Sequence, residues 1–100
     1  MKLFLDDRRP CPRGFRVARS ASDCIRLLRK HRIHVLSLDY NLGPGRPKGS
    51  EAARYIVQSR RFPKHIILHT ADRQGRLSML RLLRRNKPAG VRIGLKPYRP

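Results

Sequence analysis

The chain has 100 residues, of which 39% are hydrophobic, enough for one modest core in a single domain over residues 1–100. Its 25 Lys and Arg residues against 6 Asp and Glu residues give a formal charge of +19, which favours nucleic acid or another phosphate-bearing ligand as partner. The alternative is that the charge reflects genome composition, because 19 of the 25 basic residues are Arg and a GC-rich genome favours Arg. No apolar run is long enough for a membrane span, and Asp6 and Asp7 interrupt the apolar stretch that a secretory signal would need. The two cysteines, Cys11 and Cys24, are typical of the reduced thiols of a cytoplasmic protein.

The first part of the chain predicts two strands and a helix. An apolar run over residues 2–5 stops at Asp6 and indicates a buried strand, and a loop rich in Pro and Gly separates it from a short strand over residues 15–18. Ser20 is a favourable N-cap, with Asp23 at the capping-box position three residues later. Behind this cap the apolar residues repeat at helical spacing, with the inward stripe Ala21, Cys24, Ile25 and Leu28.

The rest of the chain alternates strands with helices. Apolar runs over residues 35–39 and 65–69 predict two further strands, and residues 91–95 predict a last one. Ser50 opens a helix after a loop rich in Gly and Pro, and Asp72 caps another. The inward residues of that last helix are predicted to be Leu77, Leu80 and Leu83.

Alternating strands and helices are typical of a mainly parallel sheet, whose ligands bind beyond the C-terminal ends of the strands. Six polar residues are predicted at or near those ends: Asp6, Asp7, Asp39, His69, Thr70 and Lys96. Three carboxylates from two strands suit Mg²⁺, and a hydroxyl and a Lys beside them suit the oxygens of a phosphoryl group. The alternative is that the carboxylates are loop caps or partners of the many Arg residues.

This pattern resembles the receiver domain of bacterial response regulators. That family has an acidic pair after its first strand, an Asp after a later strand, Thr-Ala after the next and Lys-Pro after the last, as this chain does. The resemblance implies that Asp6, Asp7 and Asp39 bind Mg²⁺, that Asp39 accepts a phosphoryl group, and that Thr70 and Lys96 contact it.

The chain is more similar to a compact receiver-like family, the cyclic-phosphate-processing receiver domain. Three motifs carry this resemblance in the expected order: LFLDDRRP at residues 3–10, LDYNLG at 38–43 and HTAD at 69–72. It covers most of residues 2–85 and implies a compact, flavodoxin-like three-layer sandwich with a parallel sheet of 4–5 strands and about 3 helices. The stretch between Asp7 and Asp39 is too short for the first helix of an ordinary receiver together with a full second strand, which agrees with the compact family.

The second motif departs from the family's usual pattern. Tyr40 and Asn41 stand where the family has His and Asp, so one possible acid–base group and one possible metal-binding carboxylate are replaced. The loop that follows carries Arg46 and Lys48, whereas it is often acidic in the family.

We therefore expect a Mg²⁺- or Mn²⁺-dependent domain that processes or binds phosphate ends of nucleic acid, such as a cyclic phosphate. In this hypothesis the metal ligands are Asp6, Asp7 and Asp39, the catalytic residues are Asp39, His69 and Thr70, and the phosphate contacts are Thr70 and Lys96. Two alternatives stay open. One is a stand-alone response-regulator receiver phosphorylated on Asp39, and the other is a non-enzymatic, basic nucleic-acid-binding module whose receiver site has decayed.

Overall fold

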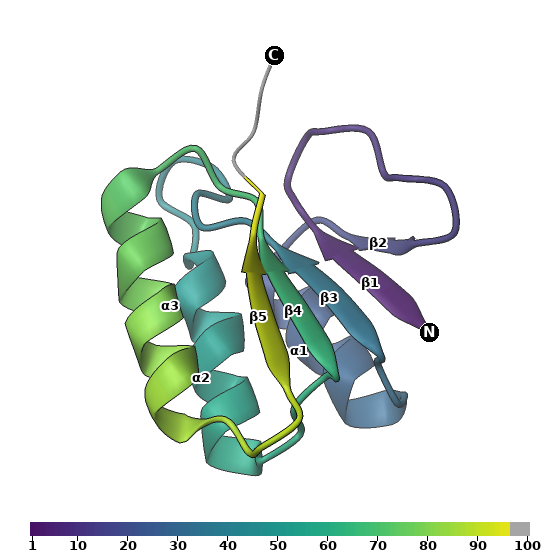
Figure 1. Ribbon diagram of the computed structural model, residues 1–100. Helices are drawn as coiled ribbons and strands as arrows, with labels where there is room; N and C mark the ends of the chain where they lie inside the picture. Colours follow the sequence, from purple (N-terminus) through teal and green to yellow (C-terminus); the bar gives the residue numbers. More distant parts are fainter. Residues whose placement is uncertain (97–100) are drawn as a thin grey trace.

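The computed structural model describes residues 1–96, so Pro97 of the Lys-Pro pair lies outside the described residues. All the predicted strands and helices are present, with small shifts at their ends (Figure 1). The strands are β1 (Lys2–Leu5), β2 (Arg16–Ala18), β3 (Val35–Leu38), β4 (His65–Leu68) and β5 (Arg92–Leu95). The helices are α1 (Ala21–Lys30), α2 (Gly49–Ser59) and α3 (Arg73–Asn86).

The five strands form one parallel sheet in the order β2-β1-β3-β4-β5. The register places Leu5 opposite Leu38, and Leu38 opposite Leu68, so these strands end level with one another. The residues that follow the three strands therefore meet at one edge of the sheet, the upper edge in Figure 1. This topology confirms the receiver-like α/β class.

One hydrophobic core lies between the sheet and the helices. Its strand residues alternate along the chain and share one face: Leu3, Leu5, Leu36, Leu38, Ile66 and Leu68, all fully buried. They form a single cluster with buried residues of all three helices. Phe4 points to the opposite face and is outside this cluster.

The three-layer sandwich expected from the sequence is therefore wrong in one respect, because the described residues form two layers, with every helix on the same face of the sheet (Figure 1). The physical reason lies in residues 6–15, which connect β1 to β2 as a loop and contain no helix. No helix in the described part of the chain is long and apolar enough to span a membrane.

The caps of α1 and α3 agree with the sequence, whereas α2 begins one residue before Ser50 and has no side-chain cap, and two details of the apolar stripes also differ. The Ser20 hydroxyl accepts a hydrogen bond from the Asp23 backbone N–H at the start of α1. In α1, Leu27 is buried and Ile25 only partly so. In α3 the buried residues are Gly75, Met79, Leu80 and Leu83, whereas Leu77 is 37% exposed. Leu77 lies two residues from both Gly75 and Met79, and that spacing turns a helical side chain to the opposite face.

Candidate functional site

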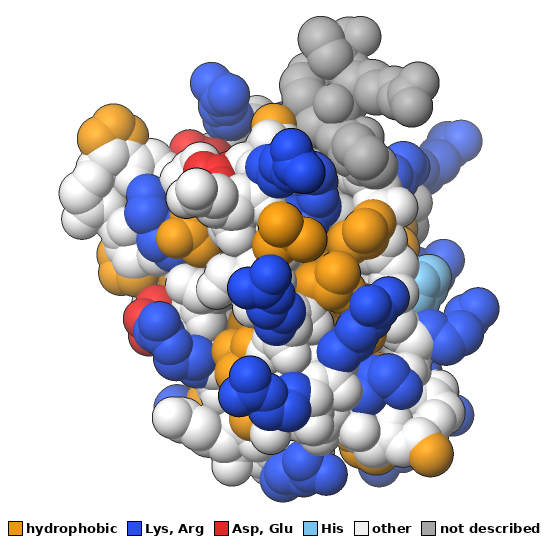
Figure 2. Space-filling model, turned by 60° about the vertical axis from the view of Figure 1, so that its left-hand side comes forward, with side chains coloured by type: hydrophobic (Ala, Val, Ile, Leu, Met, Phe, Trp, Pro, Cys, Tyr) orange, Lys and Arg blue, Asp and Glu red, His pale blue; other side chains and the backbone are white. Residues whose placement is uncertain are grey.

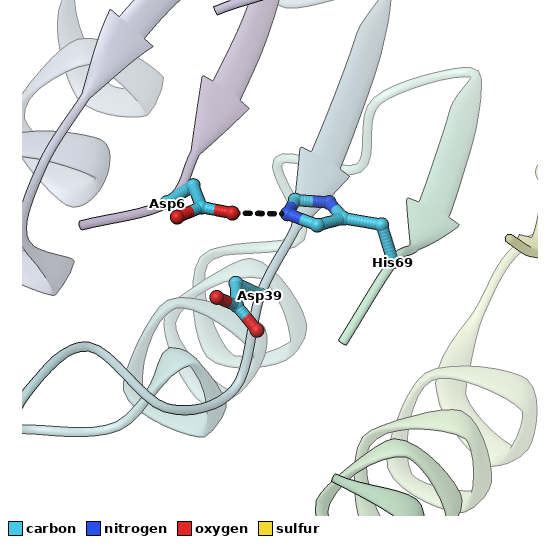
Figure 3. Close-up of side chains that lie close together, drawn as sticks. All are labelled: Asp6, Asp39 and His69. Atoms are coloured by element: carbon cyan, nitrogen blue, oxygen red, sulfur yellow. Dashed lines mark hydrogen bonds and ion pairs between the residues drawn. The ribbon is translucent and has the colours of Figure 1, made fainter. Parts of the chain in front are cut away.

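Asp6 directly follows β1 and is fully buried. Its Oδ1 accepts hydrogen bonds from the backbone N–H groups of Arg8 and Arg9, both at 3.0 Å. Its Oδ2 lies 3.0 Å from Arg9 Nη1. The same oxygen lies 3.0 Å from His69 Nε2 (Figure 3). Burial alone would raise the pKa of Asp6, but these backbone and side-chain hydrogen bonds together lower it. Asp6 is therefore held as a carboxylate.

Asp39 follows β3 and is also buried. Its Oδ1 accepts a hydrogen bond of 2.8 Å from the Tyr40 backbone N–H, and its Oδ2 lies 3.3 Å from Arg9 Nη1. Burial raises the pKa of Asp39 above its usual range, against the opposing effect of hydrogen bonds from the Thr70 hydroxyl and the Tyr40 backbone. Two neighbouring carboxyl groups thus have pKa values moved in opposite directions, a pattern typical of functional sites.

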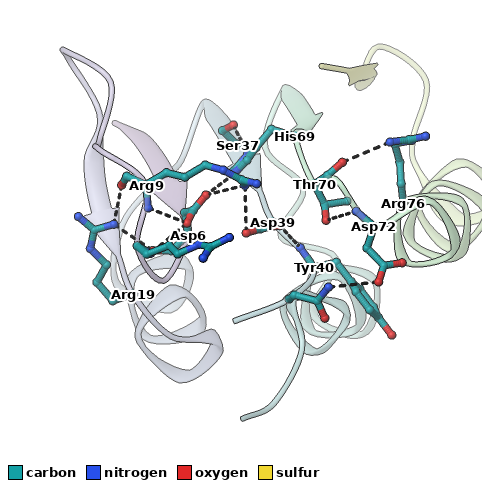
Figure 4. A network of polar contacts seen from close by, with 12 residues as sticks. Asp6, Arg9, Arg19, Ser37, Asp39, Tyr40, His69, Thr70, Asp72 and Arg76 are labelled. Atoms are coloured by element: carbon teal, nitrogen blue, oxygen red, sulfur yellow. Dashed lines mark hydrogen bonds and ion pairs between the residues drawn. The ribbon is translucent and has the colours of Figure 1, made fainter. Parts of the chain in front are cut away.

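His69 connects Asp6 to Ser37 across the sheet (Figure 4). Its Nδ1 lies 2.7 Å from the Ser37 hydroxyl, while its Nε2 faces Asp6. The imidazole also stacks on the Phe4 ring, with centroids 4.8 Å apart and planes at 7°. With its proton on Nε2, the ring donates to Asp6 and accepts from Ser37. These two hydrogen bonds and the stacking on Phe4 fix the orientation of the ring.

Arg9 is a site residue that was not predicted from the sequence. Its guanidinium lies between Asp6 and Asp39 and forms an ion pair with each (Figure 4). Arg19 holds the surrounding loop by donating to the backbone carbonyls of Asp6 and Arg9. The sequence signal was its place in the first motif, directly after the acidic pair and Arg8.

A group able to hold a metal ion is formed by Asp6, Asp39 and His69, each of which offers one ligand atom within 4.8 Å of the others. Figure 3 shows the three side chains converging from three different strands. Asp7, which the sequence predicted as a ligand, is outside this group and is only half-buried. It lines a cavity of about 240 Å³ together with Asp39 and Thr70.

Thr70 and Lys96 differ in how close they come to this site. Thr70 is buried, and its hydroxyl accepts from the Asp72 backbone N–H in addition to its bond to Asp39. Lys96 follows β5, where its backbone N–H donates to the Leu68 carbonyl, but its side chain is exposed and does not line the cavity beside Asp39. The structure thus brings Thr70 to the carboxylates and leaves the Lys96 side chain outside the cavity.

The residues that depart from the family motif face α3. The Asn41 side chain donates to Asp72 and accepts from Lys48, so it is bound to the start of α3. Asp72 caps α3 by accepting from the Gly75 backbone N–H at 2.8 Å, which confirms it as a helix cap. Hydrogen bonds from Gly75 and Asn41 lower the pKa of Asp72.

A five-stranded parallel sheet in this order, with acidic residues after its first and third strands, defines a receiver-like domain. The comparison with family models agrees, since residues 1–85 match the cyclic-phosphate processing receiver domain. The chain belongs to that family. No curated protein and no solved structure matches the chain.

Proposed function

We propose that this domain binds and processes the cyclic phosphate end of a nucleic acid with the help of a divalent cation. The observation that carries the proposal is the convergence of Asp6, Asp39 and His69 beside a cavity at the C-terminal edge of the sheet. Membership of a family of cyclic-phosphate processing domains supports it. The high positive charge of the chain favours nucleic acid as the substrate.

The donor set is chemically suited to a cation. Asp6 and Asp39 together carry two negative charges when ionised, whereas Arg9 supplies one positive charge between them. Two carboxylates and one imidazole suit Mn²⁺, and Asp7 in place of His69 would give the all-oxygen set that Mg²⁺ prefers. When bound, such an ion would neutralise charge on the phosphate oxygens.

The chain's own residues would bind the phosphate and exchange a proton. Arg9 is placed to donate to phosphate oxygens, because its guanidinium reaches the cavity beside Asp39 and Thr70. When Asp7 rather than His69 is the third metal ligand, His69 Nε2 is the group for proton transfer to or from an oxygen of the phosphodiester, because a nitrogen bound to the cation carries no proton. Phe4 and Ser37 hold the His69 ring in place.

A short RNA ending in a 2′,3′-cyclic phosphate tests this proposal. Incubated with excess protein and Mn²⁺ or Mg²⁺, it should be converted to a phosphomonoester, which is detected by its mobility and by release of phosphate with a phosphatase. Asp39→Asn and His69→Ala should abolish conversion, while Asp23→Asn, at an exposed acid of α1, should not. Absence of conversion with either metal, or conversion unchanged in Asp39→Asn, would contradict the proposal.

A second candidate function is phosphorylation of Asp39 itself. A phosphodonor in the cavity would reach Asp39 first, since Asp39 lines the cavity whereas Asp6 and His69 do not. Incubation with a small phosphodonor such as acetyl phosphate should then add the mass of one phosphoryl group to the intact chain. The gain should disappear in Asp39→Asn, and no gain in the wild-type protein would contradict this function.

A further inference from the structure

A second cavity, of about 470 Å³, lies at the opposite end of the sheet from the carboxylates. It is formed where α1 and α2 end and where β3 and β4 begin, at the lower end of the molecule in Figure 1. Six cationic side chains line this groove: Arg29, Lys30, Arg32, Arg60, Arg61 and Lys64. We call it the basic groove.

The positive charge of the basic groove is not balanced by acids. All six acidic residues of the chain lie in the described part, and none of them lines the groove. The described ion pairs of acidic residues are made elsewhere, at the candidate site and along the surfaces of α1 and α2. Basic side chains also cover the face shown in Figure 2, where acidic side chains are seen only toward the upper left and the left edge. The groove gathers six cationic side chains around one cavity, with no acid among its lining residues.

Two of the six cations are fixed in place by the protein. Arg60 Nη1 donates to the Asn86 carbonyl at 2.9 Å, and Arg61 Nη1 lies 3.4 Å from the Leu28 carbonyl. The Arg60 guanidinium also lies over the Phe62 ring, 5.3 Å from its centroid. That contact covers the aromatic ring of the groove, so bases are not expected to stack on it, and charge is left as the means of recognition.

Arg29 lies over the Tyr55 ring, 6.0 Å from its centroid, and the three remaining cations are free to meet a ligand. Lys30, Arg32 and Lys64 are exposed, and no ion pair involves their side chains in the described residues. Most of the groove's cations are Arg, whose planar guanidinium can donate two parallel hydrogen bonds to one phosphate. A groove lined by several cations and no acids is complementary to a polymer that carries one negative charge on each monomer unit.

We propose that the basic groove binds the phosphate backbone of a nucleic-acid strand without regard to its sequence. This inference extends the proposed function by stating where the nucleic acid binds. Binding at the basic groove requires neither a cation nor chemistry at Asp39. Binding of this kind weakens steeply with salt, because each phosphate contact releases condensed counterions.

The test measures binding of a short fluorescent single-stranded RNA with hydroxyl ends, in EDTA, by anisotropy at several salt concentrations. One triple variant removes the three unanchored charges by combining Lys30→Gln, Arg32→Gln and Lys64→Gln. We expect binding to weaken about tenfold and the slope of log K against log salt to become shallower by about 2, since each contact contributes about 0.7 for a single strand.

A matched control removes the same charge from the exposed side of α3 by Arg73→Gln, Arg81→Gln and Arg85→Gln. The control should weaken binding much less and leave the slope unchanged. Equal weakening in both variants, or no weakening in the groove variant, would overturn the inference, as would competition by polyglutamate as effective as that by unlabelled RNA. Asp39→Asn separates the two proposals, because it should leave this binding intact even if no cyclic phosphate is processed.

Discussion

The ring of Tyr40 lies against the backbone of Gly75, so closely that a methyl group on residue 75 would be 2.3 Å from ring carbons. Tyr40 follows the site carboxylate Asp39, and Gly75 lies in the first turn of α3. This contact fixes the start of α3, where Asp72 and Thr70 are joined by a hydrogen bond. The absence of a side chain at residue 75 thus accommodates the Tyr that replaces the family's His.

Gly75→Ala should therefore destabilise the protein through overpacking, by about 1–3 kcal/mol. In a Tyr40→Ala background the same substitution should be neutral or stabilise by up to about 1 kcal/mol, because Ala is favoured over Gly in helices. Urea unfolding of the four proteins in this double-mutant cycle measures the coupling. A penalty of equal size in both backgrounds would show that Tyr40 is not its cause.

Neutralising Asp6 and Asp39 should have opposite effects on stability in metal-free buffer. Asp6→Asn removes a buried partner of Arg9 and His69 and should cost about 2 kcal/mol at pH 7. Asp39→Asn should raise the free energy of unfolding, because burial raises the pKa of Asp39 and its ionised form is unfavourable in the folded state.

The pH dependence of these two variants follows from the directions of the pKa shifts. The lowered pKa of Asp6 stabilises the fold above the unfolded-state pKa, near 4, and this contribution is lost as the pH falls through the folded-state pKa. The penalty of Asp6→Asn should shrink in acid for that reason. The advantage of Asp39→Asn should also vanish below about pH 4, where Asp39 is protonated in both states. Parallel stability curves for all three proteins would contradict these shifts.

Arg9 should compete with divalent cations for the carboxylates. Its Nη1 contacts Oδ2 of both Asp6 and Asp39, whereas the Oδ1 atoms already accept hydrogen bonds from backbone N–H groups. Arg9→Gln should therefore bind Mn²⁺ about tenfold more tightly, as measured by calorimetry or by paramagnetic broadening of amide signals near Asp39. Arg13→Gln, at an exposed position of the same loop, should leave the affinity unchanged. Weaker Mn²⁺ binding in Arg9→Gln would show that Arg9 supports the cation site instead.

The cap of α3 should be sensitive to acid. Asp72→Ala should cost about 1 kcal/mol at pH 7, because the Gly75 backbone N–H loses its acceptor, whereas Asp72→Asn retains a capping oxygen and should cost less. The lowered pKa of Asp72 makes its contribution complete above about pH 4 and lost as the pH falls through the folded-state value. Thermal unfolding at pH 7 and pH 3 should show the gap between wild type and Asp72→Asn closing in acid.

The sequence predicted the sheet and the positions of Asp6 and Asp39, because the apolar runs that begin at residues 2 and 35 each stop at an aspartate, and parallel strands bring these ends to the same edge. It could not predict the number of layers. In β1, Leu3, Phe4 and Leu5 are all buried, which is typical of a strand covered on both faces. On the face without helices, however, Phe4 is covered by contacts with Phe15 and His69. An apolar run does not reveal whether a helix or a loop covers it.

Arg9 and Ser37 were missed for a different physical reason. Periodicity does not indicate which of 19 Arg residues turns inward, because that depends on the path of a loop. Here the path is fixed by Arg19 through two backbone carbonyls that are remote in sequence. Ser37 stands within an apolar run, and its importance depends on pairing β3 with β4, which brings it to His69.

The parallel pairing of every strand has a consequence for folding kinetics. No described strand can pair with its neighbour as a simple hairpin, so each ladder closes a loop or a helical connection before it gains any contacts. Folding is therefore expected to be slower than that of a helical bundle of this length. Asp6 and Asp39 come together only when β1 pairs with β3, so the candidate site is expected to form no earlier than the centre of the sheet.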